Sequence, residues 1–261
     1  MEYLVVSSIA LLAAALSLFS GFGLGTLLLP AFALFFPVPV AVASTAIVHL
    51  ANNVFKVGLV GGNANRDAVV RFALPAGVAA MLGAALLSWF AALPAVGSYS
   101  LGEQTRQVTW VDLVIGAIII AVAMVELLPR FQTLAFDRKY LPLGGLLSGF
   151  LGGLSGNQGA LRSAFLIKVG LSSQAFIGTT TVSAVIVDVA RLVVYGLTFY
   201  TTQLVILGSD TRGLILAATL SAFVGSFLGA RLIRKVTLRA IQVIVGVMLL
   251  LIGVGMVAGF V

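Results

Sequence analysis

The sequence contains no cysteine and only one histidine. Without cysteine there is no disulfide, thiolate nucleophile or iron–sulfur site, and a single histidine excludes a metal site built from several His or Cys ligands. The chain also lacks the Gly-x-Ser-x-Gly motif of hydrolases and the Gly-x-x-x-x-Gly-Lys motif of phosphate-binding loops. We therefore expect neither an enzyme nor a protein that carries a metal or another cofactor.

Charged residues are scarce as well. Only 9% of the 261 residues are charged and 61% are hydrophobic, whereas soluble domains have about 25% charged residues. With a mean hydropathy of +1.17, the chain is predicted to be an all-α, polytopic membrane protein that forms one transmembrane domain over residues 1–261. The net charge of +7 indicates basic cytoplasmic loops rather than a nucleic-acid partner, because Lys and Arg accumulate in such loops.

The apolar residues form two series of five segments. The first series comprises residues 3–19, 24–36, 40–60, 69–90 and 111–128. The second comprises residues 141–151, 160–169, 175–199, 214–233 and 241–260. Each series opens with a pair of segments separated by glycines. Because glycine costs a helix about 0.8–1 kcal/mol relative to alanine, we expect the helices to stop there.

The two series align with each other in order. Residues 17–25 (SLFSGFGLG) align with residues 145–153 (GLLSGFLGG), and further on Lys56 aligns with Arg191 and Gly83 with Gly229. These matches predict two repeats, residues 1–130 and 139–261. Since each repeat has an odd number of segments, the second copy is expected to be inverted in the membrane relative to the first.

Basic residues give the orientation. With both termini outside the cytoplasmic membrane, ten Lys and Arg residues fall inside and only Arg106 and Arg212 fall in outer loops. The first two segments of the second series would each span only about 15 Å, half of the hydrocarbon core. They are interpreted as re-entrant half-helices, although two short crossings give the same topology.

The glycine-rich connections within the broken pairs are the first candidate site. A helix N-terminus presents free N–H groups and about half a positive charge, and glycine lets an anion approach the backbone. Arg162 follows the second connection and is expected to face the bundle interior, because a cation at mid-membrane costs about 2.5–3.5 kcal/mol. The alternative is that these residues only pack and cap helices. The predicted substrate-binding residues here are Ser20, Gly21, Gly23, Gly25, Thr26, Gly153, Ser155, Gly156, Asn157, Gln158 and Arg162.

Polar residues on the third segment of each series form the second candidate region. Thr45, His49, Asn52, Asn53 and Lys56 share one helix face by their spacing, and in the second copy the corresponding set is Thr180, Thr181, Ser183, Asp188 and Arg191. From these we predict substrate contacts for Thr45, Asn52 and Thr180, and proton coupling through His49 and Asp188.

Each of these assignments has an alternative. A lone histidine inside a bundle is often only hydrogen-bonded. Lys56 and Arg191 are expected either to snorkel to the membrane surface or to pair structurally. The spacing of Asp188 and Arg191, three residues apart, predicts an ion pair.

At these residues the chain resembles the sulfite exporter TauE/SafE family of membrane permeases over nearly its whole length. The similarity is carried by Ser20-Gly-Phe-Gly-Leu-Gly25 followed by Pro30, and by Ser148-Gly-Phe-Leu-Gly-Gly153 in the second half; residues 156–163 (GNQGALRS) look like one branch of the family. The resemblance implies transport of small sulfur-containing anions such as sulfite. Many members carry a glycine run and a Val-Pro pair in both halves, whereas this second half has Asn157, Gln158 and Arg162.

The resulting hypothesis is a secondary transporter that moves a small sulfur oxyanion, sulfite or a short organosulfonate, across the cytoplasmic membrane by alternating access. Its expected partners are this anion and membrane lipid, and a homo-oligomer stays open. The main alternative is an anion channel that uses the same glycine-rich connections as a filter. A structural membrane subunit is a further alternative, which the absence of a cavity between the halves would favour.

Overall fold

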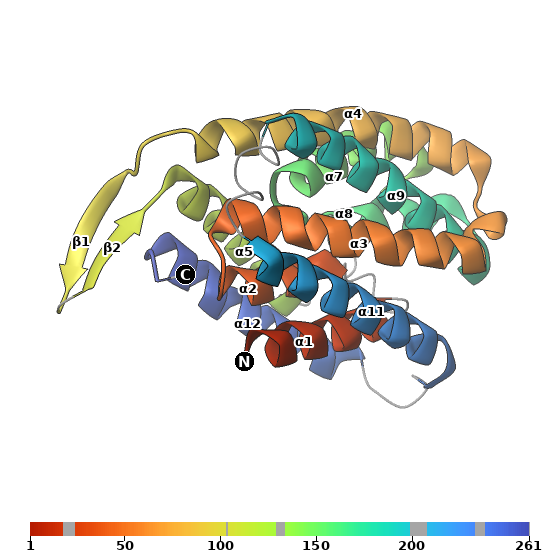
Figure 1. Ribbon diagram of the computed structural model, residues 1–261. Helices are drawn as coiled ribbons and strands as arrows, with labels where there is room; N and C mark the ends of the chain where they lie inside the picture. Colours follow the sequence, from red (N-terminus) through yellow and green to blue (C-terminus); the bar gives the residue numbers. More distant parts are fainter. Residues whose placement is uncertain (18–23, 103, 129–133, 199–207, 233–237, 261) are drawn as a thin grey trace.

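The computed structural model describes residues 1–17, 24–102, 104–128, 134–198, 208–232 and 238–260 (Figure 1). These residues form ten α-helices, three short 3-10 helices and one β-hairpin. In chain order the main elements are α1 (Glu2–Ser17), α2 (Leu24–Ala33), α3 (Val38–Val60), α4 (Arg66–Ala91), β1 (Gly97–Leu101), β2 (Gln104–Val108), α5 (Trp110–Leu127), α7 (Leu141–Ser155), α8 (Gly159–Leu166), α9 (Ser173–Thr198), α11 (Gly208–Leu232) and α12 (Leu238–Val257).

Every apolar segment expected from the sequence corresponds to one of these helices, so the helical membrane architecture is confirmed. Four helices, α3, α4, α9 and α11, are long and apolar enough to cross a membrane. The expectation of a wholly helical chain was wrong for residues 97–108. There β1 and β2 pair antiparallel about Gly102, whose φ of +63° suits a residue without a side chain. These strands are short and polar, so the search for apolar segments passed over them.

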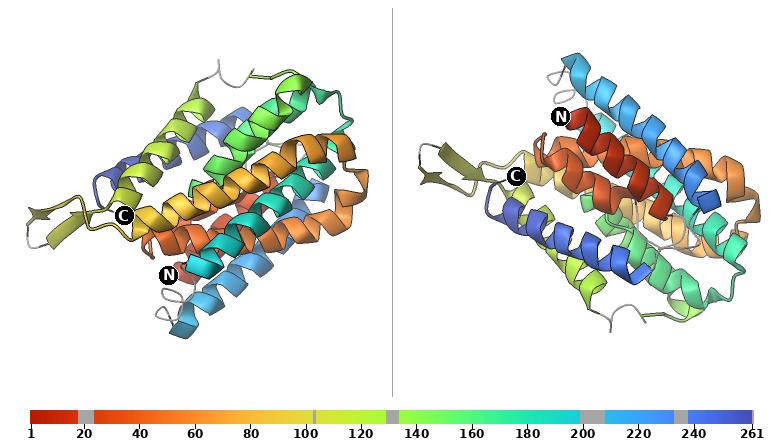
Figure 2. Two further views of the ribbon diagram at one scale, coloured as in Figure 1. Left: turned by 90° about the horizontal axis from the view of Figure 1, so that it is seen from above. Right: turned by 90° about the horizontal axis from the view of Figure 1, so that it is seen from below.

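Helices from the two halves of the chain lie side by side. Helix α4 packs against α7 and α9, α1 packs against α11, and α5 packs against α12 (Figures 1 and 2). Helices α3 and α9, the third helices of the two halves, contact each other. This arrangement places the polar faces of α3 and α9 in the interior of the bundle.

Glycines bring α7 close to α4. A Cβ atom at Gly145, Gly149 or Gly153 would collide with the backbone of α4 at Phe72, Ala76 and Ala80, respectively. Small residues at such a spacing let two membrane helices approach closely. These three glycines of α7 therefore serve helix packing, which was the alternative to a binding role in the sequence analysis.

The α7–α8 pair returns to the end of the bundle at which it begins. The Phe136 N–H, just before α7, donates to the carbonyl oxygen of Ala164, near the end of α8, at 3.1 Å. The two helices have 15 and 8 residues, so the connection between them lies inside the bundle. The pair therefore forms a helical hairpin whose two outer ends lie at the same end of the bundle.

The break between α7 and α8 is shorter than the sequence predicted. Helix α7 continues through Gly152 and Gly153 to Ser155, and α8 begins at Gly159. The break is therefore only residues 156–158. Pro30 and Pro75 lie inside α2 and α4 rather than at helix ends. Membrane helices tolerate proline where neighbouring groups satisfy the freed carbonyl.

Both termini lie at the end of the bundle that carries the β-hairpin (Figure 2). The opposite end holds exposed ion pairs between Asp67 and both Arg71 and Arg138, and between Asp137 and Lys168. These charged residues therefore lie at the end of the bundle away from the termini.

Candidate functional site

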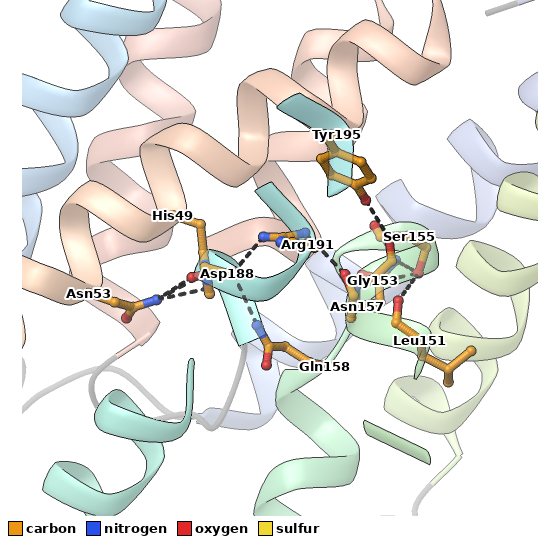
Figure 3. Close-up of polar contacts among 11 residues, drawn as sticks. His49, Asn53, Leu151, Gly153, Ser155, Asn157, Gln158, Asp188, Arg191 and Tyr195 are labelled. Carbon is orange, nitrogen blue, oxygen red and sulfur yellow. Dashed lines mark hydrogen bonds and ion pairs between the residues drawn. The ribbon is translucent and has the colours of Figure 1, made fainter. Parts of the chain in front are cut away.

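A buried carboxylate lies at the centre of the bundle. Asp188 of α9 accepts a hydrogen bond from Arg191 Nη2 on Oδ1 at 2.7 Å, and its Oδ2 lies 2.6 Å from Nδ1 of His49 on α3 (Figure 3). All three side chains are buried. The predicted ion pair between Asp188 and Arg191 is therefore confirmed, and His49 joins it from the other half of the chain.

Two amides complete the surroundings of this carboxylate. Asn53 Nδ2, one turn beyond His49, lies 3.3 Å from Asp188 Oδ2, and Gln158 Nε2 reaches Oδ1 at 3.4 Å (Figure 3). Asp188 is thus surrounded by N–H donors from α3, from α9 and from the α7–α8 connection. A buried carboxylate needs such donors, because an unpaired charge in a low-dielectric interior is strongly unfavourable.

Arg191 and Tyr195 also hold the end of α7. Arg191 Nη1 donates to the carbonyl oxygen of Gly152 at 3.1 Å, and the Tyr195 hydroxyl donates to that of Gly153 (Figure 3). Gly156 ends the helix with a φ of +79°, a conformation that glycine adopts without penalty. The Gly152 carbonyl also accepts from the Gly156 N–H at 3.0 Å, whereas carbonyl groups further along the last turn lack partners within the helix. Arg191 and Tyr195 thus tie the end of α7 to α9.

The start of α2 lies beside the α7–α8 break. A Cβ atom built on Gly25, in the first turn of α2, would lie 3.1 Å from the carbonyl oxygen of Gly156 and 3.7 Å from Cγ2 of Thr45. The start of α2, the α7–α8 break and the polar face of α3 therefore adjoin one another. Ser20, Gly21 and Gly23, also predicted to bind substrate, lie outside the described residues.

Arg162 points into this region from the first turn of α8. Its side chain is 8% exposed, and its Nε and Nη1 atoms have no hydrogen-bond partner among the residues that the structure describes. It forms no ion pair with any of those residues either. The prediction that Arg162 faces the bundle interior is confirmed, and its guanidinium retains N–H donors for a ligand.

Lys56 of α3 is the second buried cation of this region. Its side chain is 5% exposed, and Nζ donates to Ser17 Oγ, at the end of α1, at 2.6 Å. Turning the Asn52 amide by 180° lets its oxygen accept from Nζ at 3.3 Å and its nitrogen donate to Ser226, which is the orientation we adopt. Snorkelling, one of the two expectations for Lys56, was therefore wrong.

The remaining predicted substrate residues divide into two groups. Buried side chains beside the break include Thr45, whose hydroxyl has no partner among the described residues, and Thr26. Ser155 donates to its own helix at Leu151, and Asn157 Nδ2 lies 3.3 Å from Ser155 Oγ (Figure 3).

The second group lies apart from the break or faces another helix. Thr180 is only partly buried and donates to the carbonyl oxygen of Ile177 within α9, so the structure does not bring it to the cluster. The α-carbon of Gly153 faces Ala80 of α4, a packing position.

The sequence assigned no substrate role to Lys56, although its position on the polar face of α3 was an available signal. Tyr195 gave no signal, because its contact with Gly153 depends on how α9 packs against α7. Within the described part of the chain, no group of three His, Asp or Glu side chains gathers as a metal site would require.

A separate pocket of about 380 Å³ opens at the end of the bundle that carries the hairpin. It lies between the start of α3, the end of α4 and the C-terminal residues, and Arg106, Asp112 and Phe260 are among its lining residues. Asp112 and Thr109 form a capping box at the start of α5, so this acidic group serves a helix terminus.

Comparison with known proteins agrees with this architecture. Residues 6–256 match the protein family described as "Sulfite exporter TauE/SafE". No curated protein and no solved structure gives a significant match. The family comprises membrane transporters rather than enzymes, and its match covers all ten described helices in whole or in part. The chain therefore belongs to the sulfite exporter TauE/SafE family of multi-pass membrane transporters.

Proposed function

We propose that the protein is a secondary transporter for a small sulfur oxyanion such as sulfite, and that it binds this anion where the α7–α8 break meets the start of α2. One observation carries the proposal. Among the described residues, the centre of the bundle holds three buried cations, Lys56, Arg162 and Arg191, and one buried carboxylate, Asp188. Asp112, the other buried carboxylate of these residues, lines the pocket at the hairpin end.

The imbalance follows from how these charges are paired. Asp188 is committed to Arg191 and His49, so Lys56 and Arg162 have no ion-pair partner among the described residues. Two cations in a membrane interior are unfavourable without a counter-charge. An anion that enters this region supplies the negative charge and accepts hydrogen bonds from the free N–H groups of Arg162.

An inverted two-repeat architecture is part of the proposal, and the helix contacts support it. The first helix of each half packs against the fourth helix of the other, since α1 contacts α11 and α7 contacts α4. The third helices contact each other, as do the fifth. In both halves the third helix carries a cation bonded to the end of the first, Lys56 to Ser17 and Arg191 to Gly152.

Such an architecture supports alternating access, in which one half moves against the other around a central site. Lys56, Arg162, Asp188 and Arg191 are all buried in this structure, which corresponds to an occluded conformation. His49 and Asp188 link α3 to α9 across the two halves, so a proton taken up or released by this pair would change the contact between them. Proton coupling through this pair and a position of both termini outside the cell belong to the same proposal.

The test is sulfite counterflow into liposomes that contain the purified protein. Because Arg162 provides the unpartnered donors, Arg162→Gln is expected to lower the initial rate by at least about thirtyfold, the effect of removing one partner of a buried charge pair. Arg162→Lys should keep part of the activity, and Arg71→Gln, which removes an exposed cation at the bundle end, should keep all of it.

Two results would contradict the proposal. Equal counterflow by the native protein and Arg162→Gln would remove the substrate role of Arg162. Sulfite flux that neither saturates nor responds to sulfite on the opposite side would instead favour the channel alternative.

A further inference from the structure

The proposed site holds one cation that the sequence did not predict to bind substrate. Lys56 lies on α3, in the first half of the chain, and Arg162 lies on α8, in the second. Lys56 bonds Ser17 at the end of α1, and Arg162 follows the break at residues 156–158. The two buried cations therefore come from the two different halves of the chain.

Resting on the proposed function, we infer that Lys56 is a second anion-binding residue, and that Lys56 and Arg162 together select doubly charged anions over singly charged ones. The bonds from Lys56 to Ser17 and to the Asn52 oxygen use two of the three N–H donors of its ammonium group. One donor therefore remains for a ligand, and Arg162 retains its own free donors.

Charge balance gives the selectivity. Arg191 is neutralised by Asp188 at 2.7 Å, so the two charges in excess belong to Lys56 and Arg162. A dianion such as sulfite or thiosulfate neutralises both. A monoanion such as methanesulfonate leaves one buried positive charge without a partner, and such a charge is strongly unfavourable inside a protein.

A purely structural role for Lys56 makes a different prediction. If Lys56 served only to anchor Ser17 and the end of α1, its loss would weaken transport of every anion by the same factor. A ligand role changes the ratio between dianion and monoanion transport, because only the dianion needs the second cation. The ratio is therefore the informative measurement.

The experiment measures uptake of four probes into liposomes that contain the purified protein, at neutral to slightly alkaline pH, where thiosulfate is a dianion and much of the sulfite is doubly charged. Sulfite and thiosulfate are the dianions, and methanesulfonate and nitrate are the monoanions. The native protein is expected to move the dianions at least about tenfold faster than the monoanions. Lys56→Gln should lower dianion uptake by about thirtyfold and change monoanion uptake by less than about threefold.

Two variants serve as controls. Lys56→Arg retains the positive charge and should retain the dianion preference. Lys139→Gln removes an exposed cation at the start of α7 and should leave all four rates unchanged. Thermal melting of each purified variant identifies any variant that fails to fold. If a variant fails to fold, the ratio of dianion to monoanion uptake by the native protein still tests the predicted selectivity.

The outcomes separate this inference from the proposed function. Uptake of sulfite without any preference for dianions, or equal losses of both classes in a folded Lys56→Gln variant, overturns the inference and leaves the proposed function standing. Absence of uptake for both sulfur dianions by the folded native protein overturns the proposed function itself.

Discussion

Replacing Asp188 by asparagine is expected to destabilise the protein substantially. The change keeps the size of the side chain but removes its charge, which leaves Arg191 as a fully buried cation with no carboxylate. Removing one partner of a buried ion pair costs about 3–5 kcal/mol. His49 also loses its carboxylate partner, so Asp188→Asn should lower the free energy of unfolding by about that amount.

The measurement is equilibrium unfolding of the purified protein in detergent micelles. A double-mutant cycle with Arg191→Met separates the ion pair from other effects, because the double variant contains neither charge. The cycle should give a coupling energy of at least about 1 kcal/mol between the two positions, as residues in direct contact show. Asp137→Asn is the matched control. Asp137 is exposed and lies 3.9 Å from Lys168, so this change should have no resolvable effect on unfolding.

Two results would refute this reasoning. If Asp188→Asn unfolded within about 0.5 kcal/mol of the native protein, the carboxylate would not be compensating a buried cation. If the effects of the two single substitutions were simply additive, Asp188 and Arg191 would not form the pair that organises the centre of the bundle.

Substitutions at the α4–α7 contact and at the end of α7 give three further expectations, each checked by the same unfolding measurement. Gly149→Ala should destabilise the protein by at least about 1–3 kcal/mol, because its Cβ atom would collide with the backbone at Ala76; unchanged stability would contradict the close contact. Gly58→Ala, whose Cβ atom would meet nothing within 4 Å inside α3, should instead stabilise by about 0.5–1 kcal/mol, and a loss of stability would argue against a helix there. Tyr195→Phe removes the hydroxyl that bonds the Gly153 carbonyl and should cost about 0.5–1.5 kcal/mol, so no change would show that this bond does not hold the end of α7.

The sequence predicted the helices well because membrane helices depend on local composition. Each must contain a long apolar run, and glycine or charge interrupts it. The same reasoning missed the hairpin at residues 97–108, which lies outside the apolar runs, and placed the break of α7 too early. Gly153 stays helical where α4 packs against α7 and leaves no space for a side chain, and Gly152 faces Gln158 and Val187 instead. That contact depends on the tertiary structure and is not visible in local sequence.

The sequence predicted those relations within the site that depend on local helical spacing. Helical spacing alone placed His49 and Lys56 on one face of α3 and paired Asp188 with Arg191, because both relations are local. The bond between His49 and Asp188 joins residues 139 positions apart, so it required the fold. The same is true of Thr180, which shares the spacing of the polar face but lies away from the cluster.

The central claim is that an oxyanion binds among the buried cations where the α7–α8 break meets the start of α2. A crystal structure of the protein in lipid with selenite, a heavier analogue of sulfite that is located by anomalous scattering, tests this claim most directly. The account predicts an anomalous peak with the selenite oxygens within hydrogen-bond distance of Arg162 Nε or Nη1. Selenite found only at the exposed basic end, near Arg138 and Lys139, while the same preparation transports selenite, would contradict it.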